Sequence, residues 1–330
     1  MSPATKCATA EQMVLQTSAL MRVNVIMMST LALLTFFLTY KALHLLQRRQ
    51  IFHPSTKILL YTSLVFVNVH EVIFMIIQGA AFVRSFTLSD KPCEIMRTTE
   101  ECRFQNHVLI SGLAGINFTQ FAMTIDRFIA TIIPQKYATC GSFPGLFLSI
   151  IVVISSISAP LIIAIGDRYD DIVPNCFFFP QNSAPRVNIF LVILSVMVII
   201  SIVLNFLIIC VNKKLEKSSR FHVQQRYQKR EALVSTRIIS YIAGSQFLGL
   251  SLYSTLVLTL RLHKPFIPVS MYHNIVWWAY TVPFAAVSLP ALLICRINQV
   301  GSNRKRVINR ITAKVETQEE HMKSLKQLWG

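Results

Sequence analysis

The sequence predicts an all-α membrane protein, a bundle of seven transmembrane helices with its N-terminus outside and its C-terminus in the cytoplasm. Three observations support this prediction. The 330 residues contain seven long apolar runs, 14% of them are charged where soluble domains carry about 25%, and the basic residues concentrate between alternate runs. A mean hydropathy of +0.51 agrees with a chain that lies largely in lipid.

Each apolar run is long enough to cross a bilayer, because about 20 helical residues span a hydrocarbon core of about 30 Å. Most runs contain no charge, and several are apolar on every face, as helices in lipid are. An extracellular segment (1–22) and a basic cytoplasmic tail (295–330) would flank the bundle (23–294). The predicted spans are Val23–Tyr40, Ile58–Phe82, Val108–Ile133, Leu146–Ile165, Val187–Val211, Ile238–Leu260 and Val269–Ile294.

Three prolines fall inside the predicted spans. Pro160 lies in the fourth span, and Pro283 and Pro290 lie in the seventh. Because proline removes a backbone donor, we expect these residues to kink their helices. Two kinks in the seventh span would suit either a bistable element or a pair of fixed bends.

The basic residues set the predicted orientation. With the N-terminus outside, 22 of the 32 lysines and arginines fall on the inner side. The positive-inside rule therefore favours an external N-terminus. The net charge of +17 then lies mainly at the cytoplasmic face, where we expect an anionic inner leaflet and a polar or acidic partner. Because the charges lie between apolar runs, we expect no nucleic-acid partner.

Four of the seven cysteines, Cys7, Cys93, Cys102 and Cys176, fall in outer segments, where disulfides persist. Four cysteines allow three pairings, and spacing alone does not decide among them. We favour Cys102 with Cys176, which would tie the third span to the second outer loop, and Cys7 with Cys93. Free thiols are the alternative.

The other three cysteines, Cys140, Cys210 and Cys295, fall at inner helix ends. We expect them to be buried thiols. Cys295 adjoins Arg296 at the end of the seventh span, where palmitoylation is a further option.

Asp126 and Arg127 lie at the inner end of the third span. Cys102 precedes Arg127 by 25 residues, about one membrane thickness with its headgroups. This placement resembles the Asp/Glu-Arg-Tyr motif of G-protein-coupled receptors. The resemblance implies that Asp126 holds Arg127 at rest and releases it toward a G-protein helix end, whose partial negative charge suits arginine. The alternative is a solvated helix end without a further role.

The whole chain resembles the nematode serpentine chemoreceptors of class alpha (Sra), or the sister class alpha-beta, more than the rhodopsin-like receptors. In place of an Asn-Pro-x-x-Tyr motif, the seventh span carries Ser288-Leu289-Pro290. The resemblance covers about residues 7–310. It rests on the segment from Arg226 to Glu231 with Ser235 and Thr236 after it, on Asn117 to Arg127, and on Leu289 to Leu293 before the basic tail.

The resemblance implies a multi-pass receptor of the plasma membrane, including that of sensory neuron cilia. It would bind a small external ligand and signal through a heterotrimeric G protein. No zinc-protease, serine-hydrolase or phosphate-loop motif is present, so we expect neither enzyme activity nor a cofactor. A seven-span carrier and a ligand-gated channel are the alternatives. A channel of the insect odorant-receptor kind would need the opposite orientation.

A basic third inner loop precedes the sixth span. Topology and attraction to lipid explain most of its cations. Lys229, Arg230 and Glu231 stand directly before the span, so we expect them to contribute to G-protein coupling.

Glu71 is the only acid deep within a predicted span, about 20 Å from the inner start of the second. A carboxyl at that depth must be paired or protonated. Asn68 shares its helix face, whereas we expect the adjacent His70 to point elsewhere. We expect Glu71 and Asn68 to form a polar switch node with Asn117 or Ser288, or an ion site. A neutral structural glutamate is the alternative.

The outer halves of spans 3, 5, 6 and 7 offer a ligand pocket of aromatic and polar side chains. Small-molecule sites have this mixed character. Each tryptophan or tyrosine has an alternative role as an anchor at the membrane interface. The candidates are His107, Ser111, Tyr253, His273, Trp277, Trp278 and Tyr280.

Overall fold

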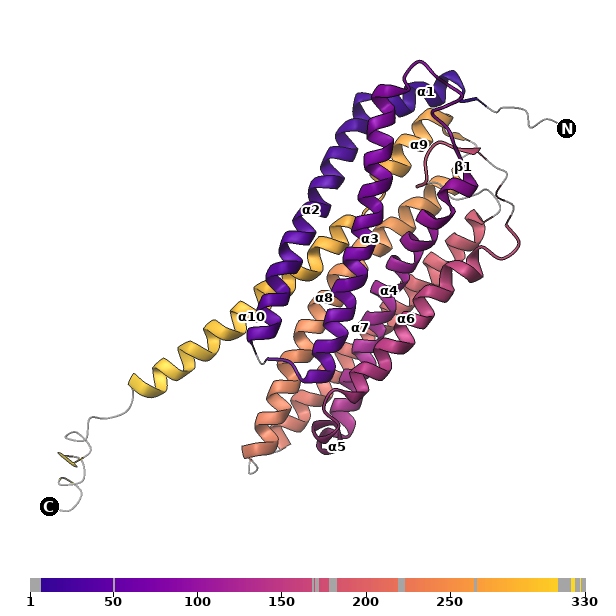
Figure 1. Ribbon diagram of the computed structural model, residues 1–330. Coiled ribbons are helices and arrows are strands. Elements are labelled where there is room, and N and C mark those ends of the chain that lie inside the picture. Colours follow the sequence, from indigo (N-terminus) through magenta and orange to yellow (C-terminus); the bar gives the residue numbers. More distant parts are fainter. Residues whose placement is uncertain are drawn as a thin grey trace.

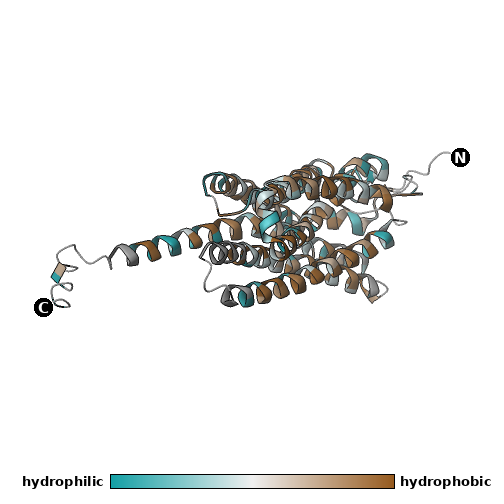
Figure 2. Cartoon of the chain, turned by 90° about the horizontal axis from the view of Figure 1, so that it is seen from below, coloured by the Kyte–Doolittle hydropathy of each residue, from teal (hydrophilic) through white to brown (hydrophobic). Residues whose placement is uncertain are grey.

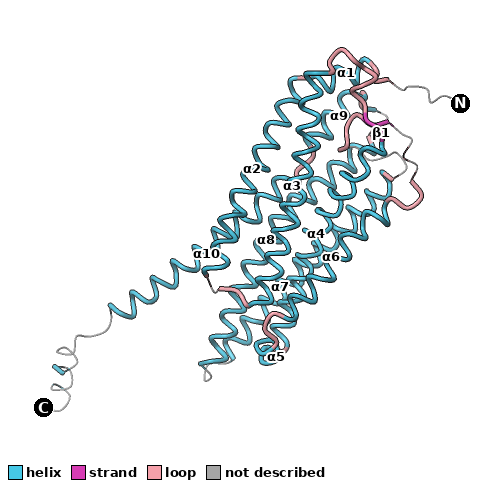
Figure 3. Tube along the Cα trace, in the orientation of Figure 1, coloured by secondary structure: helices cyan, strands magenta, loops and turns pink. Residues whose placement is uncertain are grey.

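The computed structural model describes residues 7–49, 51–167, 169, 172–177, 183–218, 223–263, 266–313, 322–323 and 327. Long α-helices packed side by side make up nearly all of this part of the chain (Figure 1, Figure 3). Seven helices in the described ranges are long and apolar enough to cross a membrane. The prediction of an all-α bundle with seven spans is therefore confirmed.

Most helices begin before the predicted apolar run and end after it, because polar and charged residues form further helical turns at both ends. The elements are α1 (Ala10–Thr17), α2 (Ala19–Arg48), α3 (Pro54–Thr87), β1 (Arg97–Thr98), α4 (Thr99–Ile132), α5 (Pro134–Thr139), α6 (Phe143–Ile163), β2 (Ile172–Val173), α7 (Ala184–Ser218), α8 (Val223–Leu262), α9 (Val269–Trp278) and α10 (Val282–Ala313). The short helix α1 lies in the segment that was predicted to precede the bundle.

The bundle has two structurally different ends. One end, here called the disulfide end, carries α1, the ribbon β1–β2 and α9, and the other, the Asp126 end, carries α5 (Figure 1). Disulfides join Cys7 to Cys93 and Cys102 to Cys176, the pairing favoured above. The loop that contains Cys176 is therefore fixed to the start of α4 by a covalent bond as well as by the ribbon.

Helix α4 is the central helix of the bundle. Of its most apolar stretch, 72% is buried, against 33% for the corresponding stretch of α2. Close packing against α3 requires glycine, because a Cβ on Gly115 would lie 2.1 Å from the ring of Phe66. The central position of α4 places Cys102 at one end of the bundle and Arg127 at the other.

The outer surface of the bundle is apolar, as lipid contact demands. Phe37, Val65 and Phe206 are 54%, 59% and 64% exposed. Figure 2 shows hydrophobic residues along all the helices of the bundle. The prediction that Cys140, Cys210 and Cys295 are buried was wrong, because they are exposed on surfaces directed away from the packed core.

The seventh predicted span is split into two helices. Helix α9 ends at Trp278 and α10 begins at Val282. Pro283 therefore lies in the first turn of α10 and not in the interior of a helix. Proline is tolerated there because the first N–H groups of a helix have no intrahelical partner. Helix α10 keeps Pro290 inside and continues to Ala313, where it extends beyond the rest of the bundle (Figure 1).

Candidate functional site

Asp126 and Arg127 form a buried ion pair at the Asp126 end of α4. The two side chains are 0% and 3% exposed, and Arg127 Nη2 lies 2.6 Å from Asp126 Oδ2. Arg127 Nε donates to the same oxygen at 3.2 Å. A buried charge is tolerated only when it is paired and hydrogen-bonded, so the partners around this pair decide its stability.

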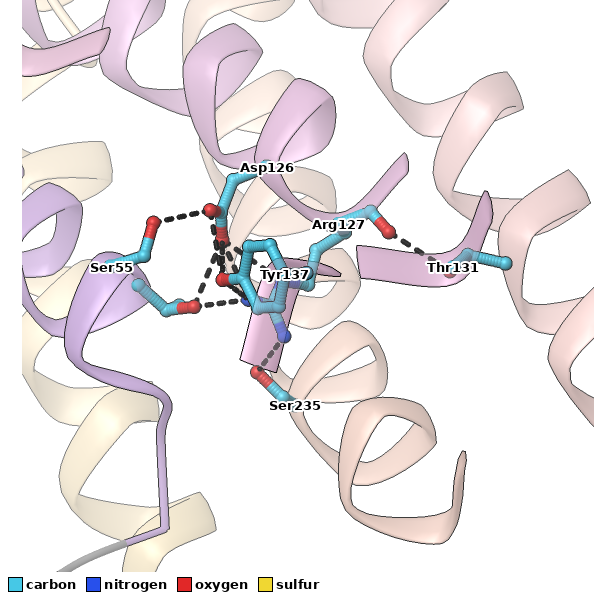
Figure 4. Close-up of polar contacts among 7 residues, drawn as sticks. Ser55, Asp126, Arg127, Thr131, Tyr137 and Ser235 are labelled. Carbon is cyan, nitrogen blue, oxygen red and sulfur yellow. Dashed lines mark hydrogen bonds and ion pairs between the residues drawn. The ribbon is translucent and has the colours of Figure 1, made fainter. Parts of the chain in front are cut away.

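Hydroxyl groups from two other elements complete the shell of Asp126 (Figure 4). Ser55 donates to Oδ1 at 2.6 Å and Thr56 to Oδ2 at 2.9 Å, both from the first turn of α3. The Tyr137 hydroxyl, from α5, donates to Oδ1 at 2.9 Å. The carboxylate therefore accepts hydrogen bonds from three hydroxyl groups in addition to those from Arg127.

Arg127 joins the pair to α8. Its Nη1 donates to Ser235 Oγ at 3.1 Å, and its Nη2 donates to Tyr137 at 2.7 Å and also to Thr56. Neither Asp126 nor Arg127 has a buried polar atom without a partner among the described residues. We call the group Ser55, Thr56, Asp126, Arg127, Tyr137 and Ser235 the Asp126 cluster. It links the first turn of α3, the last turns of α4, the short helix α5 and α8.

The edge of the Asp126 cluster carries a histidine. The rings of His53 and Tyr137 lie 4.4 Å apart between centroids. Burial lowers the pKa of His53, and Arg127 lowers it further, while Asp126 acts in the opposite direction. Burial raises the pKa of the Tyr137 hydroxyl, with Arg127 opposing that shift. Tyr137 thus remains a hydrogen-bond donor at physiological pH.

Sequence reasoning identified the ion pair but missed three of its partners. Ser55 and Thr56 lie about 70 residues before Asp126 in the chain, and Tyr137 lies in the short helix α5. Ser235 was named in the sequence analysis only as part of the family resemblance. Two adjacent hydroxyl residues at the start of a span, and a tyrosine just after the Asp-Arg pair, were the available signals. The coupling candidates Lys229, Arg230 and Glu231 lie on α8, and their side chains lie outside what the structure describes.

Glu71 contacts His70, contrary to the prediction that His70 points elsewhere. His70 Nδ1 lies 3.0 Å from Glu71 Oε1, and Nε2 lies 2.7 Å from the hydroxyl of Tyr280. Neighbouring positions on a helix diverge by about 100° at Cα, but both side chains are fully buried, and the His70 ring lies between Glu71 and Tyr280, which belongs to the link between α9 and α10. The chain of contacts Glu71–His70–Tyr280 replaces the expected node.

The other predicted members of that node lie in separate contacts. Asn68 donates to Thr39 of α2 at 3.2 Å. Asn117 donates to the carbonyl of Leu113 in its own helix at 2.8 Å. Ser288 pairs with Ser245 of α8 at 3.1 Å. Each joins or stabilises helices locally, and the hydrogen bonds of the described residues do not connect them to Glu71.

Aromatic side chains form a cluster on the disulfide-end side of Glu71. Tyr280 lies 5.0 Å from Phe74, 4.6 Å from Phe177 and 5.1 Å from Tyr253 between ring centroids. Phe177 also lies 6.2 Å from Trp277. All five are buried, which contradicts the alternative that Tyr253, Trp277 and Tyr280 are interface anchors.

The remaining pocket candidates lie elsewhere or outside the described side chains. Half-buried His107 lines a small cavity of about 20 Å³ with Arg103 and Tyr169. Ser111 is half-buried on α4, and Trp278 is 38% exposed. The side chain of His273 lies outside the described part.

A larger groove of about 730 Å³ opens on the lipid-facing side of α2, α3 and α4. Its lining includes exposed Tyr40, Val65 and Phe104. Asn68 is the one predicted site residue among the residues that line it. An apolar groove on this surface suits lipid chains.

Comparison with known proteins decides the family. The family model described as "Serpentine type 7TM GPCR chemoreceptor Sra" matches residues 2–329. The chain belongs to the serpentine class alpha chemoreceptors. It is 76% identical to Serpentine receptor class alpha-10 of Caenorhabditis briggsae, over 98% of both chains.

Other class alpha receptors give the same result. Serpentine receptor class alpha-10 of Caenorhabditis elegans is also 76% identical, over 98% of this chain and 97% of the relative. Serpentine receptor class alpha-1 of Caenorhabditis elegans is 32% identical, over 89% of both chains. The resemblance stated from the sequence is confirmed. The family is one of multi-pass receptors rather than enzymes.

Proposed function

We propose that this class alpha receptor lies in the plasma membrane with its disulfide end outside, binds a small external ligand and activates a heterotrimeric G protein through Arg127. One observation carries the proposal. The Asp126 cluster fastens α8 to α4 through a buried arginine, at the end of the bundle that the positive-inside rule assigns to the cytoplasm. A ligand that favours a different packing of α8 would thereby change the environment of Arg127.

The hydrogen bonds of Asp126 allow Arg127 to leave. If α8 moves outward, the bond from Arg127 to Ser235 is lost first, because Ser235 is the member of the cluster that α8 contributes. Asp126 keeps the hydroxyls of Ser55, Thr56 and Tyr137 and is not stranded without donors. Arg127 can then extend toward the C-terminus of a partner helix. Lys229, Arg230 and Glu231 would move with α8.

The test measures ligand-independent nucleotide exchange in membranes that contain the full-length receptor and a panel of Gα subunits. Ser235→Ala removes a hydrogen bond to a charged group, worth about 1.5 kcal/mol or more, so we expect about a tenfold rise in basal exchange. Adding Arg127→Ala should abolish the rise. Ser240→Ala is the matched control, because the Ser240 hydroxyl bonds only the Thr236 carbonyl of its own helix among the described residues.

Three results would contradict this proposal. Basal exchange that is equal in Ser235→Ala, Ser240→Ala and the unmodified receptor would remove the role of the α8 contact. Exchange that persists without Arg127 would remove the arginine. An epitope at the N-terminus that antibodies reach only after permeabilisation would reverse the orientation and favour the channel alternative.

A further inference from the structure

Glu71 has a carboxylate oxygen that the protein leaves unused. The side chain is fully buried, and Oε1 contacts His70, whereas Oε2 has no hydrogen-bond partner among the described residues. A buried polar atom without a partner costs about 1–3 kcal/mol, and more when it is charged. Ionisable side chains inside membrane spans are costly, and they mark functional sites.

Further unpartnered polar atoms lie between Glu71 and the disulfide end. Gln78 is two turns along the same face of α3, and its Oε1 has no partner among the described residues. Asn24 of α2 is fully buried, and neither its Oδ1 nor its Nδ2 has a hydrogen-bond partner among the described residues. It lies one turn from Met28, which packs in the same core as Phe74. These groups supply mainly acceptor oxygens to one side of the bundle.

The aromatic cluster adjoins this acceptor group. Tyr280 is connected to Glu71 through His70, and Phe74, Phe177 and Tyr253 surround its ring. Faces of aromatic rings attract cations, by about 2 kcal/mol or more when the site is desolvated. Phe177 follows Cys176 directly, so the disulfide keeps its ring over this cluster.

Charge decides what such a site accepts. Among the described residues, Arg127 is the only buried lysine or arginine, and it lies at the opposite end of the bundle. A ligand carboxylate next to Glu71 would find no buried lysine or arginine there, and the imidazole of His70 already contacts Glu71 Oε1. A protonated amine would donate to Glu71 Oε2 and place its charge against the ring faces.

We propose that the receptor binds a small protonated amine with an apolar body, with Glu71 as the ammonium partner and the rings around Tyr280 as the enclosure. This inference rests on the proposed receptor function and names the chemical class of its ligand.

The experiment measures thermal unfolding of the purified full-length receptor, without a G protein, at equal concentrations of three probes with one aryl body. These are 2-phenylethylamine, 2-phenylethanol and phenylacetate. Only the amine should raise Tm, since a ligand stabilises the state it binds. Glu71→Gln should weaken amine binding at least tenfold. Glu94→Gln, which removes an exposed acid of the disulfide end, should leave it unchanged.

The outcomes separate this inference from the proposed function. Equal stabilisation by the alcohol or by phenylacetate overturns the amine site, as does unchanged amine binding in Glu71→Gln. Failure of a series of amines of increasing bulk to raise Tm overturns it too. If E71Q does not fold, the discrimination among the three probes by the unmodified receptor decides. Amine binding without nucleotide exchange would refute G-protein coupling and leave the amine site standing.

Discussion

Two buried carboxylates, Asp126 near one end of the bundle and Glu71 at the middle of α3, have opposite degrees of hydrogen-bond satisfaction. Asp126 accepts three hydroxyl hydrogen bonds and an arginine, and both of its oxygens are used. Glu71 contacts one imidazole, and its second oxygen has no partner among the described residues. Both side chains are fully buried, so burial does not explain the difference.

The difference indicates opposite roles. A polar cluster that is already complete stabilises the conformation in which it is seen, and it must be pulled apart for that conformation to change. A polar group that is incomplete becomes complete only when another molecule supplies the missing donor. The Asp126 cluster therefore suits a contact that holds the resting state, and Glu71 suits a contact that a ligand makes.

The largest expected effect comes from breaking the complete cluster. Asp126→Ala leaves Arg127 buried without its anion, and removing one partner of a buried pair costs about 3–5 kcal/mol. We expect a large drop in Tm of the purified receptor and a corresponding loss from the cell surface.

An exposed pair serves as the control for Asp126→Ala. Arg97 and Glu101 form an ion pair of the same 2.6 Å length at the disulfide end, but the side chains are 37% and 51% exposed. Solvent screens such pairs, so Glu101→Ala should cost less than about 1 kcal/mol. Similar losses from the two substitutions would show that burial does not set the strength of the Asp126 cluster.

The next largest effect concerns the Cys102–Cys176 bond, which holds Phe177 beside Tyr280. Cys102→Ser and Cys176→Ser should each lower stability by about 2–4 kcal/mol, and the double substitution should add little, because either change removes the same bond. Cys140→Ser, at a free exposed cysteine, should have no effect. Additive losses in the double variant would contradict a single shared bond.

The sequence predicted the features that depend on composition and on position along one helix. Seven apolar runs define the spans, and the 25 residues from Cys102 to Arg127 place a cysteine and an arginine at opposite ends of α4. The pair Asp126–Arg127 was identifiable for the same reason. Each of these inferences needs only the rise per residue and the thickness of a bilayer.

The sequence could not predict contacts that packing alone creates. Ser55 reaches Asp126 across 71 residues and Ser235 reaches Arg127 across 108. The position of His70 was predicted wrongly because helix geometry fixes the direction of Cβ, whereas the rotation of a long side chain depends on its neighbours. The break between α9 and α10 was not predicted, because the sequence around Pro283 does not show whether this proline lies in the first turn of a helix or in its interior.

The smallest expected effect concerns His53, which lies at the edge of the Asp126 cluster, and it is measured as the pH dependence of stability. Because burial and Arg127 lower the pKa of His53 from its ordinary 6.5, the unfolded chain binds more protons than the folded one just below that pH. Stability should therefore fall as the pH drops from 7.5 to 5.5.

In His53→Gln this contribution is absent, so the Tm of the variant should fall less over the same range, while the other histidines contribute equally to both proteins. The effect should be small because solvent reaches the half-exposed ring. A steeper fall in His53→Gln than in the unmodified receptor would show that protonated His53 is stabilised by Asp126 rather than opposed by Arg127.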